Sequence, residues 1–581
     1  MRTDRILPYL RSRPEGVLLL AALVVRLLGI AARPIWYDEA FAVLFASQSP
    51  ARMAYGTLAP DALGSTADIH PLGYYTLLWA WMGVFGRSII AGRILSVLIS
   101  CAAFWLAIRL MKGLFGEQTA WWAGVFLALS PFHVHYSQEI RMYGLLAFFL
   151  IGATFVYSRA LGLFADGNRH GAGNWILFTV FSAAAMYTHN LAAFYLAPLA
   201  LIPFWLPALR GRFGTAKRKR DRTHRATSGI DPAVATSTPR PSAHSPIRPF
   251  PPPPIRPFAA SPLRPSAHSP IRNTLLASTA AALLYLPWLV HLPGQLARVG
   301  TAYWTQPPGG DRFVTTLLTF VSNLPVSQVL LPFALLAAFL TLALSVWQTL
   351  KAILQRPRRE SLVPGLILAY LAFIPPMLMF VVSQFFPVYI ERALLPSGIL
   401  FLLWVAWALI ETGIPRFVRL FATIALLVGM FIGLQTHLTY SGFPYAPFDD
   451  VNAAIRASIE TGGGSIRTGT VIVHSNKLTA LPAHLLDPDL PHRYLPDIPG
   501  SGSDTLALPT QNVIGLFADE DIAAAIGDAT RVWFVVFRQE VDEYLTAGES
   551  AHPQLAWLDE RFTRISSERW DDLIVYEYAA P

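Results

Sequence analysis

Long apolar runs recur through the first 436 residues of this 581-residue chain. A helix rises about 1.5 Å per residue, so a run of roughly 20 apolar residues can cross a bilayer. The pattern predicts an all-α polytopic membrane domain with about eleven transmembrane helices. Their approximate ranges are 16–32, 90–108, 118–133, 142–160, 174–188, 191–207, 273–292, 327–349, 362–385, 394–411 and 417–436.

The distribution of basic residues predicts the orientation of these helices. Cytoplasmic loops of membrane proteins carry an excess of Lys and Arg. If the arginine-rich N-terminus is cytoplasmic, every cytoplasmic loop of the chain is basic. We therefore expect a multi-pass cell-membrane protein whose first run is a retained signal-anchor. This orientation requires residues 70–88, "HPLGYYTLLWAWMGVFGRS", to lie as interfacial helix on the outer face instead of spanning.

Residues 208–272 interrupt the apolar pattern. They contain the basic cluster "KRKRDRTHR" and Pro/Ser/Arg units, with an arginine every eight residues from Arg240 to Arg272. Such a segment cannot bury a core, so we expect a disordered cytoplasmic linker. It would join a catalytic transmembrane half at 1–207 to a second half at 273–436. The linker is interpreted either as a tether for anionic lipids or a partner, or as a low-complexity insertion.

The last segment, residues 437–581, resembles a small soluble domain in composition. It holds 9 Lys/Arg and 21 Asp/Glu, a net charge of −12, whereas the whole chain carries +9. "DDVNAAIRASI" has helical periodicity, and "TVIVH", "RVWFVVF" and "DLIVYEY" are typical of strands. We expect a C-terminal extracytoplasmic α/β domain.

Composition excludes several function classes. The chain is 54% hydrophobic and 14% charged, whereas soluble domains are roughly 25% charged. It contains neither a P-loop nor a dinucleotide-binding fingerprint, and nothing indicates a nucleic-acid partner. Cys101 is the single cysteine, so an intrachain disulfide is impossible.

Polar residues gather in the loops predicted to face outside. "IWYDEAF" places Asp38 and Glu39 just after the first run, and "SPFHVHYSQEIRMYG" forms a second outer loop at 130–144. Ionisable groups near a bilayer are costly, so their gathering on one side indicates chemistry at the outer leaflet. The candidate phosphate-binding cations are Arg141 and Arg392, and the candidates for binding or orienting a substrate are His70, Gln138, Glu139, Tyr143, His189 and Tyr389.

Each of these features also has a purely structural explanation. The acidic pair suits the positive end of a helix dipole, and the arginines suit interfacial anchors. His189 fits a hydrogen-bonded structural role as well as a binding role. "HVH" followed by Glu139 is a weak zinc pattern. No metal is predicted, although the acidic pair and the histidines leave a divalent ion open.

Group transfer outside the cytoplasm needs a donor delivered by the membrane, such as a polyprenyl-phosphate-linked sugar. The reaction needs a carboxylate to deprotonate the acceptor hydroxyl and fixed cations to hold the lipid phosphate. Asp38 fits the base, with Glu39 beside it for orientation or acceptor binding. Arg141 and Arg392 fit a phosphate clamp through bidentate donation. Such a displacement inverts the anomeric carbon and requires no cofactor.

"WYDEA", "HPLGYY", the 130–144 loop and "YIERALLPS" together resemble the integral-membrane C-type glycosyltransferases. The resemblance is to the branch of protein O-mannosyltransferases and lipid A aminoarabinose transferases, and it covers roughly residues 10–436. It implies a lipid-phosphate sugar donor, extracytoplasmic catalysis, an acidic base in the first outer loop (here Asp38) and interfacial helices in that loop. The chain departs from the family at "HPL" 70–72, where His-Pro-Pro is common, and at His135, where an aromatic residue is expected.

The expected function is that of a hexosyl- or pentosyltransferase acting on a lipid, polysaccharide or protein acceptor. The alternative is a polytopic lipid or glycolipid transporter or flippase. That class often shows charged or broken spans and internal repeats, whereas these spans are almost free of charge away from their ends, with Arg26 the exception. A third interpretation is a non-catalytic scaffold that uses the linker and the outer domain to bind partners.

Overall fold

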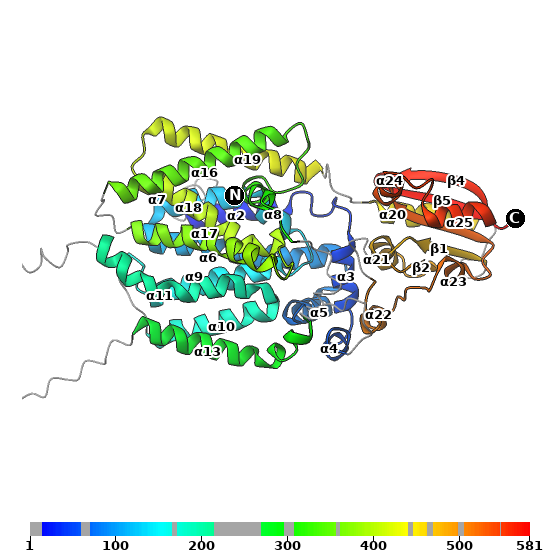
Figure 1. Cartoon of the computed structure of the whole chain (residues 1–581), viewed down its shortest axis with the longest axis horizontal. Helices are drawn as coiled ribbons and strands as arrows, with labels where there is room; N and C mark the ends of the chain where they lie inside the picture. Colours follow the sequence, from blue (N-terminus) through cyan, green and yellow to red (C-terminus); the bar gives the residue numbers. More distant parts are fainter. Residues whose placement is uncertain are drawn as a thin grey trace, which may run out of the picture.

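The computed structural model describes residues 14–59, 70–165, 171–213, 269–295, 307–355, 361–439, 446–461, 469–497, 505–546 and 548–581. Long helices lie side by side in a bundle, and a smaller domain built on a sheet lies at one end of it (Figure 1). The bundle helices are α2 (Pro14–Leu27), α6 (Ile89–Phe115), α7 (Glu117–Ala128), α9 (Tyr143–Ala160), α10 (Ala172–Thr188), α11 (Ala193–Phe213), α13 (Pro270–Leu289), α16 (Leu331–Leu354), α17 (Leu362–Ser383), α18 (Leu395–Glu411) and α19 (Arg416–Thr439).

Seven helical stretches among the described residues are long and apolar enough to cross a membrane. Each coincides with a predicted apolar run, so the helical, multi-pass character of the chain is confirmed. The four remaining predicted runs contain α2, α7, α10 and α13. The total of eleven spans stays a prediction. The seven stretches are Ile89–Phe115, Tyr143–Ala160, Asn190–Gly211, Leu331–Leu354, Leu362–Ser383, Glu391–Glu411 and Arg416–Thr439.

Three short helices form the connection between α2 and α6. They are α3 (Tyr37–Ala46), α4 (Pro50–Leu58) and α5 (Gly73–Phe85). Asp38 and Glu39 lie in the first turn of α3, where the helix dipole favours negative charge. With 13 residues, α5 is shorter than each of the seven candidate spans, and it exposes Trp79, Val84 and Phe85. These features agree with the predicted interfacial segment.

Further short helices bring the other predicted outer loops to the same end of the bundle. Residues 130–144 contain α8 (Pro131–Ser137), whose first turn is capped by the Ser130 hydroxyl. The remaining short helices there are η2 (Asn190–Ala192), α15 (Asp311–Val321) and η3 (Glu391–Leu394).

Most of the predicted 208–272 linker, residues 214–268, lies outside the described residues. Helix α11 ends at Phe213 and α13 begins at Pro270, both at the end of the bundle far from the sheet domain (Figure 1). The attachment points of the linker and the sheet domain therefore lie at opposite ends of the bundle.

The C-terminal domain is a mixed five-stranded sheet with helices, in the order β2-β1-β3-β5-β4. Strand β1 pairs in parallel with β2 and β3, and β5 pairs antiparallel with β3 and β4. The predicted α/β domain is confirmed, because its three predicted strand segments form β1, β3 and β5. The strands are β1 (Thr470–His474), β2 (His492–Tyr494), β3 (Arg531–Phe537), β4 (Thr563–Trp570) and β5 (Leu573–Ala579), and the helices are α20 (Phe448–Thr461), α21 (Lys477–Leu486), α22 (Leu508–Ile514), α23 (Ile522–Ile526), α24 (Arg538–Thr546) and α25 (Pro553–Arg561).

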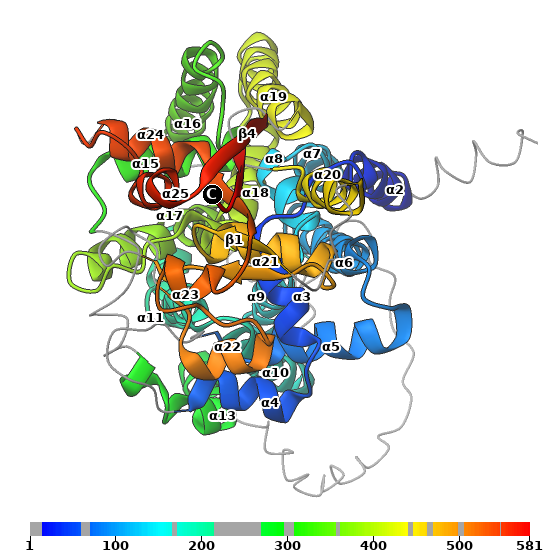
Figure 2. The ribbon, with the colours of Figure 1, turned by 90° about the vertical axis from the view of Figure 1, so that its right-hand side faces the viewer.

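The C-terminal domain packs directly on helices α3 and α4 of the connection between α2 and α6. Helix α21 contacts α3, and α22 contacts both α3 and α4 (Figure 2). Thr510 Oγ1 donates to the Gly56 carbonyl at 2.9 Å, and a Cβ added to Gly56 would lie 2.7 Å from Val513 Cγ2. The domain therefore covers the helix that carries Asp38.

Candidate active site

The Asp38 carboxylate is the meeting point of three segments that lie far apart in the sequence. Arg392 Nη1 donates to Asp38 Oδ2 at 2.6 Å, and Arg141 Nε lies 3.8 Å from the same oxygen. Arg141 Nη1 also donates to the Asp38 carbonyl at 3.5 Å. Asp38 is only 8% exposed and Arg141 only 5%. Two guanidinium groups thus converge on one buried carboxylate, as a base next to a phosphate clamp requires.

The charges around Asp38 keep it ionised. Burial by itself would raise the pKa of Asp38, but Arg141 and Arg392, with a smaller contribution from His70, hold it below its ordinary value. At neutral pH the group is therefore a carboxylate that can accept a proton.

Aromatic and imidazole rings line the neighbourhood of this carboxylate. The Arg392 guanidinium lies over the Tyr143 ring at 5.4 Å, and the Tyr143 and His189 ring centroids are 5.9 Å apart. His70 packs edge-on against His189 at 5.0 Å. The structure thus brings His70, Tyr143 and His189 to Arg392, as predicted from the sequence.

His189 presents a hydrogen-bond donor to this space. Its Nδ1 accepts from the Leu191 N–H at 3.1 Å, so the ring proton of neutral His189 resides on Nε2. Burial, together with His70, Arg141 and Arg392, lowers the pKa of His189 well below its usual value, which favours this neutral form. Nε2 is buried and has no hydrogen-bond partner among the described residues. A buried donor of this kind needs an acceptor, which a substrate hydroxyl would supply.

Glu39 makes its hydrogen bonds with groups other than Arg141 and Arg392. Its Oε1 and Oε2 accept from Arg93 Nε at 2.9 Å and from Arg93 Nη2 at 2.7 Å. Oε1 also accepts from the Ile140 N–H at 3.2 Å. The adjacent acids therefore have different partners: Asp38 pairs with Arg141 and Arg392, and Glu39 forms a buried ion pair with Arg93.

Glu139 forms a second buried acidic position behind Asp38. Its Oε1 lies 3.1 Å from His135 Nε2 and 3.6 Å from Arg33 Nη2. Burial raises the pKa of Glu139 to about 7, despite the opposing effect of Arg33, and the Asp38 charge adds to the increase. Glu139 therefore exchanges its proton near neutral pH.

Two further sequence candidates make their hydrogen bonds elsewhere. Gln138 Nε2 donates to the carbonyls of Arg26 and Leu28 at 2.8 and 2.7 Å, and its Oε1 lies 2.8 Å from His437 Nε2. These bonds fix the end of the first run against the 130–144 loop. The Tyr389 hydroxyl pairs with Thr316 Oγ1 at 2.6 Å, which holds the chain just before η3 against α15.

Arg93, Arg33 and His437 were not among the site residues predicted from the sequence. Arg93 is a buried charge near the start of α6, inside an otherwise apolar run, and this position was the available signal. The contacts of Arg33 and His437 depend on tertiary packing, because their partners lie about 100 and 300 positions away.

No group of three His, Cys, Asp or Glu side chains in the described part of the chain is arranged to hold a metal ion. The absence of a cofactor requirement stays a prediction.

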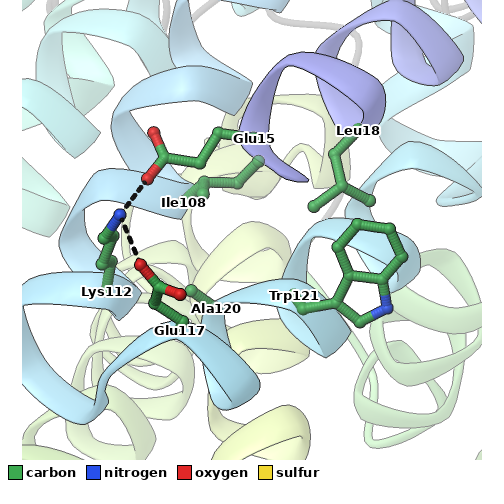
Figure 3. A pocket seen from close by; sticks show the side chains of 7 residues that line it. All are labelled: Glu15, Leu18, Ile108, Lys112, Glu117, Ala120 and Trp121. Atoms are coloured by element: carbon green, nitrogen blue, oxygen red, sulfur yellow. Dashed lines mark hydrogen bonds and ion pairs between the residues drawn. The ribbon is translucent and has the colours of Figure 1, made fainter. Parts of the chain in front are cut away.

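A small pocket of about 20 Å³ lies elsewhere in the bundle. At one side of it Lys112 Nζ bridges Glu15 at 2.7 Å and Glu117 at 3.1 Å, and the ring of Trp121 lines the other side (Figure 3). Lys112 follows Arg93 by nineteen residues on α6, about 28 Å along the helix. The pocket is therefore separate from the Asp38 site.

The comparisons with known proteins agree with the site. Residues 69–218 match the family model described as dolichyl-phosphate-mannose-protein mannosyltransferase. This stretch contains the 130–144 loop, Arg141 and His189. This part of the chain is therefore similar to a family of membrane glycosyltransferases. The resemblance to C-type membrane glycosyltransferases predicted from the sequence is thereby confirmed.

Two solved structures share the fold of this chain. One is ArnT from Cupriavidus metallidurans bound to undecaprenyl phosphate, with 13% identity, a TM-score of 0.53 and coverage of 97% of this chain and 98% of that chain. The other is ArnT from Cupriavidus metallidurans in the apo state, with 14% identity, a TM-score of 0.53 and coverage of 98% of both chains. The likeness extends over the bundle and the C-terminal domain. No curated protein sequence matches the chain.

Proposed function

We propose that this glycosyltransferase moves a sugar from a polyprenyl-phosphate donor to an acceptor hydroxyl at the extracytoplasmic face, with inversion of the anomeric carbon. The observation that carries the proposal is the buried Asp38 carboxylate held between Arg141 and Arg392. A base and a pair of phosphate-binding cations are the groups that this transfer needs in one place.

The two arginines would hold the donor phosphate. Guanidinium groups stay charged and bind phosphate oxygens in a bidentate manner, so they stabilise the charge that develops as the sugar leaves. The family description names a dolichyl-phosphate sugar, and the fold is shared with a protein crystallised with undecaprenyl phosphate. Both support a lipid-phosphate donor.

The acceptor oxygen attacks the anomeric carbon while the bond from that carbon to the phosphate oxygen breaks. Asp38 accepts the proton of the acceptor hydroxyl, and the polyprenyl phosphate leaves with the bonding electron pair. Donor phosphate competes with Asp38 for Arg392 and Arg141. Binding of the donor therefore weakens the pairing of Asp38 and makes this carboxylate a stronger base when it is needed.

The remaining groups would orient the substrates. The buried Nε2–H of His189 donates to a sugar or acceptor hydroxyl, with the Tyr143 and His70 rings forming the wall beside it. The loops that carry these groups are fixed in place by the hydrogen bonds and ion pairs of Glu39, Gln138, Glu139 and Tyr389.

The proposed orientation places the N-terminus and the 208–272 linker in the cytoplasm and the C-terminal domain outside. The attachment of linker and domain at opposite bundle ends supports it (Figure 1). No cofactor is proposed, because the phosphate is a competent leaving group and the two arginines supply positive charge.

The test uses full-length protein in lipid nanodiscs with radiolabelled polyprenyl-phosphate sugars and, separately, lipid, polysaccharide and peptide acceptors. The wild type should transfer label to one of them, and Asp38→Asn should lower kcat by about 100- to 10,000-fold. Asp311→Asn is the matched control, because it removes an exposed carboxylate from the first turn of α15. Full activity of Asp38→Asn at normal folding would overturn the proposal, and lipid flipping without transfer would favour the transporter alternative.

A further inference from the structure

The Arg93 guanidinium bonds both to the segment between α2 and α3 and to the first turn of α3. Besides its two bonds to Glu39, Arg93 Nη1 donates to the carbonyls of Ile30 and Arg33 at 2.8 and 2.7 Å, and Nη2 donates to the Pro34 carbonyl at 3.1 Å. All five N–H groups thus have an acceptor, and the residue is 1% exposed. The chain from the end of α2 to the first turn of α3 is therefore fixed at four residues by one side chain.

The same face of α6 also holds the 130–144 loop. Ser96, three positions after Arg93, donates to the Glu139 carbonyl at 2.6 Å. A Cβ added to Gly92 would lie 2.7 Å from Ile140 Cδ1, so the loop lies close against the helix there. Glu39 links the two segments directly, because its Oε1 accepts from the Ile140 N–H. Helix α6 is thus a shared platform for the Asp38 segment and the Arg141 segment.

We propose that Arg93 and Glu39 are positioning residues for sugar transfer, which set the distance between the base Asp38 and the phosphate-binding Arg141. The inference rests on the proposed function. Asp38 directly precedes Glu39, and Arg141 directly follows Ile140, so each group is one residue away from an anchored atom. A shift of the platform changes the alignment of base and clamp together.

Stability alone is a poor explanation of this arrangement. Replacing a buried ion pair with well-packed apolar side chains is often neutral or stabilising, so the pair need not stabilise the fold. What apolar packing cannot supply is directional bonding of one guanidinium to four residues at fixed angles. A misplacement of about 1 Å can cost a reaction roughly 100-fold in rate.

The experiment measures kcat and donor KM for Arg93→Met, Arg93→Lys and Glu39→Gln in the full-length protein, with Tm recorded alongside. The Arg93→Met and Glu39→Gln variants should lose about 100-fold in kcat, with less than tenfold change in KM. The double variant Arg93→Met/Glu39→Gln should lose no more than either single variant, because the pair acts as one unit. Arg93→Lys keeps the positive charge but not the forked guanidinium, so its kcat should exceed that of Arg93→Met by less than tenfold.

Arg87→Met is the matched control, because Arg87 is an exposed cation in the turn just before α6, and its kcat should stay within twofold of wild type. If the Arg93 variants do not fold, Ser96→Ala removes a single bond of the platform and should lower kcat by about 3- to 10-fold. An inactive wild type, or an active Asp38→Asn, would refute the proposed function. Loss of activity in Asp38→Asn with unchanged kcat in folded Arg93, Glu39 and Ser96 variants would refute the positioning role alone.

Discussion

At the scale of single residues, Arg392 provides the sharpest test of the phosphate clamp. Its Nη1 bonds Asp38 and its guanidinium plane lies over Tyr143, and both contacts depend on the planar fork that lysine lacks. Arg392→Lys should therefore lower kcat/KM for the lipid donor by about 10- to 100-fold even though the charge is kept. The measurement is initial-rate kinetics with varied donor.

Arg312→Lys is the control for this prediction. Arg312 forms a partly exposed pair with Glu391 at 2.9 Å, and such pairs contribute little energy. Its kinetics should match those of the wild type. Equal effects of the two substitutions would mean that charge near η3, and not the Arg392 fork, holds the donor.

Glu139 gives a prediction for the pH dependence of stability. Its pKa is about 7 in the folded protein, against 4.5 ordinarily, so the unfolded chain loses this proton first as pH rises. The contribution of Glu139 is therefore favourable below about pH 4.5 and is lost as pH rises through 7. The free energy of unfolding of Glu139→Gln, taken relative to that of the wild type, should rise by on the order of 2–3 kcal/mol between pH 5 and pH 8.

Thermal unfolding in detergent at pH 5 and pH 8 measures this difference. Glu117→Gln serves as the control, because the Glu117 side chain is 71% exposed and is solvated in both states. Its effect should be the same at both pH values. A Glu139→Gln effect that does not change with pH would contradict the assignment.

The sequence indicated which residues gather near one end of the bundle, but not which of them touch. Asp38, Arg141 and Arg392 were selected together because each lies just outside an apolar run. The same rule predicted a catalytic role for Glu39 next to Asp38. In the structure the Glu39 carboxylate instead pairs with Arg93, 54 positions away. Periodicity and charge counts contain no information on such pairing, since it depends on how α3 and α6 pack.

At the scale of elements, the close approach of α5 to α10 makes a prediction about the His70–His189 contact. Gly73 begins α5, and a Cβ added there would lie 2.5 Å from the Tyr187 carbonyl oxygen. That backbone atom cannot yield as a flexible side chain would. Gly73→Ala should move α5 away from α10 and separate His70 from His189. It should lower the free energy of unfolding by about 1–3 kcal/mol and reduce the transfer activity.

Gly83 on the same helix is the matched control. A Cβ added to Gly83 meets nothing within 4 Å, so Gly83→Ala should be neutral or stabilise α5 by about 0.5–1 kcal/mol. Tm and transfer rate of both variants are measured side by side. Equal behaviour of the two would show that the α5–α10 spacing does not matter to the site.

Most helices and strands were predictable from the sequence, and the break within one predicted run was not. Strands β1 and β3 coincide with "TVIVH" and "RVWFVVF" because buried β-branched and aromatic runs bounded by polar residues are typical of strands. The predicted run at 118–133 divides into α7 and α8 around Ser130, whose hydroxyl caps a new helix beginning with Pro131. An apolar run alone does not show such a break, because the cap consists of one serine.

At the scale of the whole molecule, the C-terminal domain is expected to support catalysis through its contact with α3. Ala480 and Leu481 of α21 belong to the same buried core as Phe41 and Phe45 of α3, so the helix that carries Asp38 has one of its sides covered by this domain. Val513 of α22 is buried where Gly56 of α4 approaches most closely. Val513→Arg would place an unpaired charge in this contact and separate the domain from α4 and α3.

We expect Val513→Arg to lower the transfer rate by about tenfold or more, since a loosened α3 misplaces Asp38 relative to Arg141 and Arg392. Hydrogen exchange should accelerate over α3 and α22. Ile565→Arg is the control, because Ile565 is 57% exposed on β4 and the substitution adds the same charge to the same domain. Faster exchange at α22 in Val513→Arg with an unchanged transfer rate would mean that the bundle alone orders α3, and that the C-terminal domain serves the acceptor or another partner.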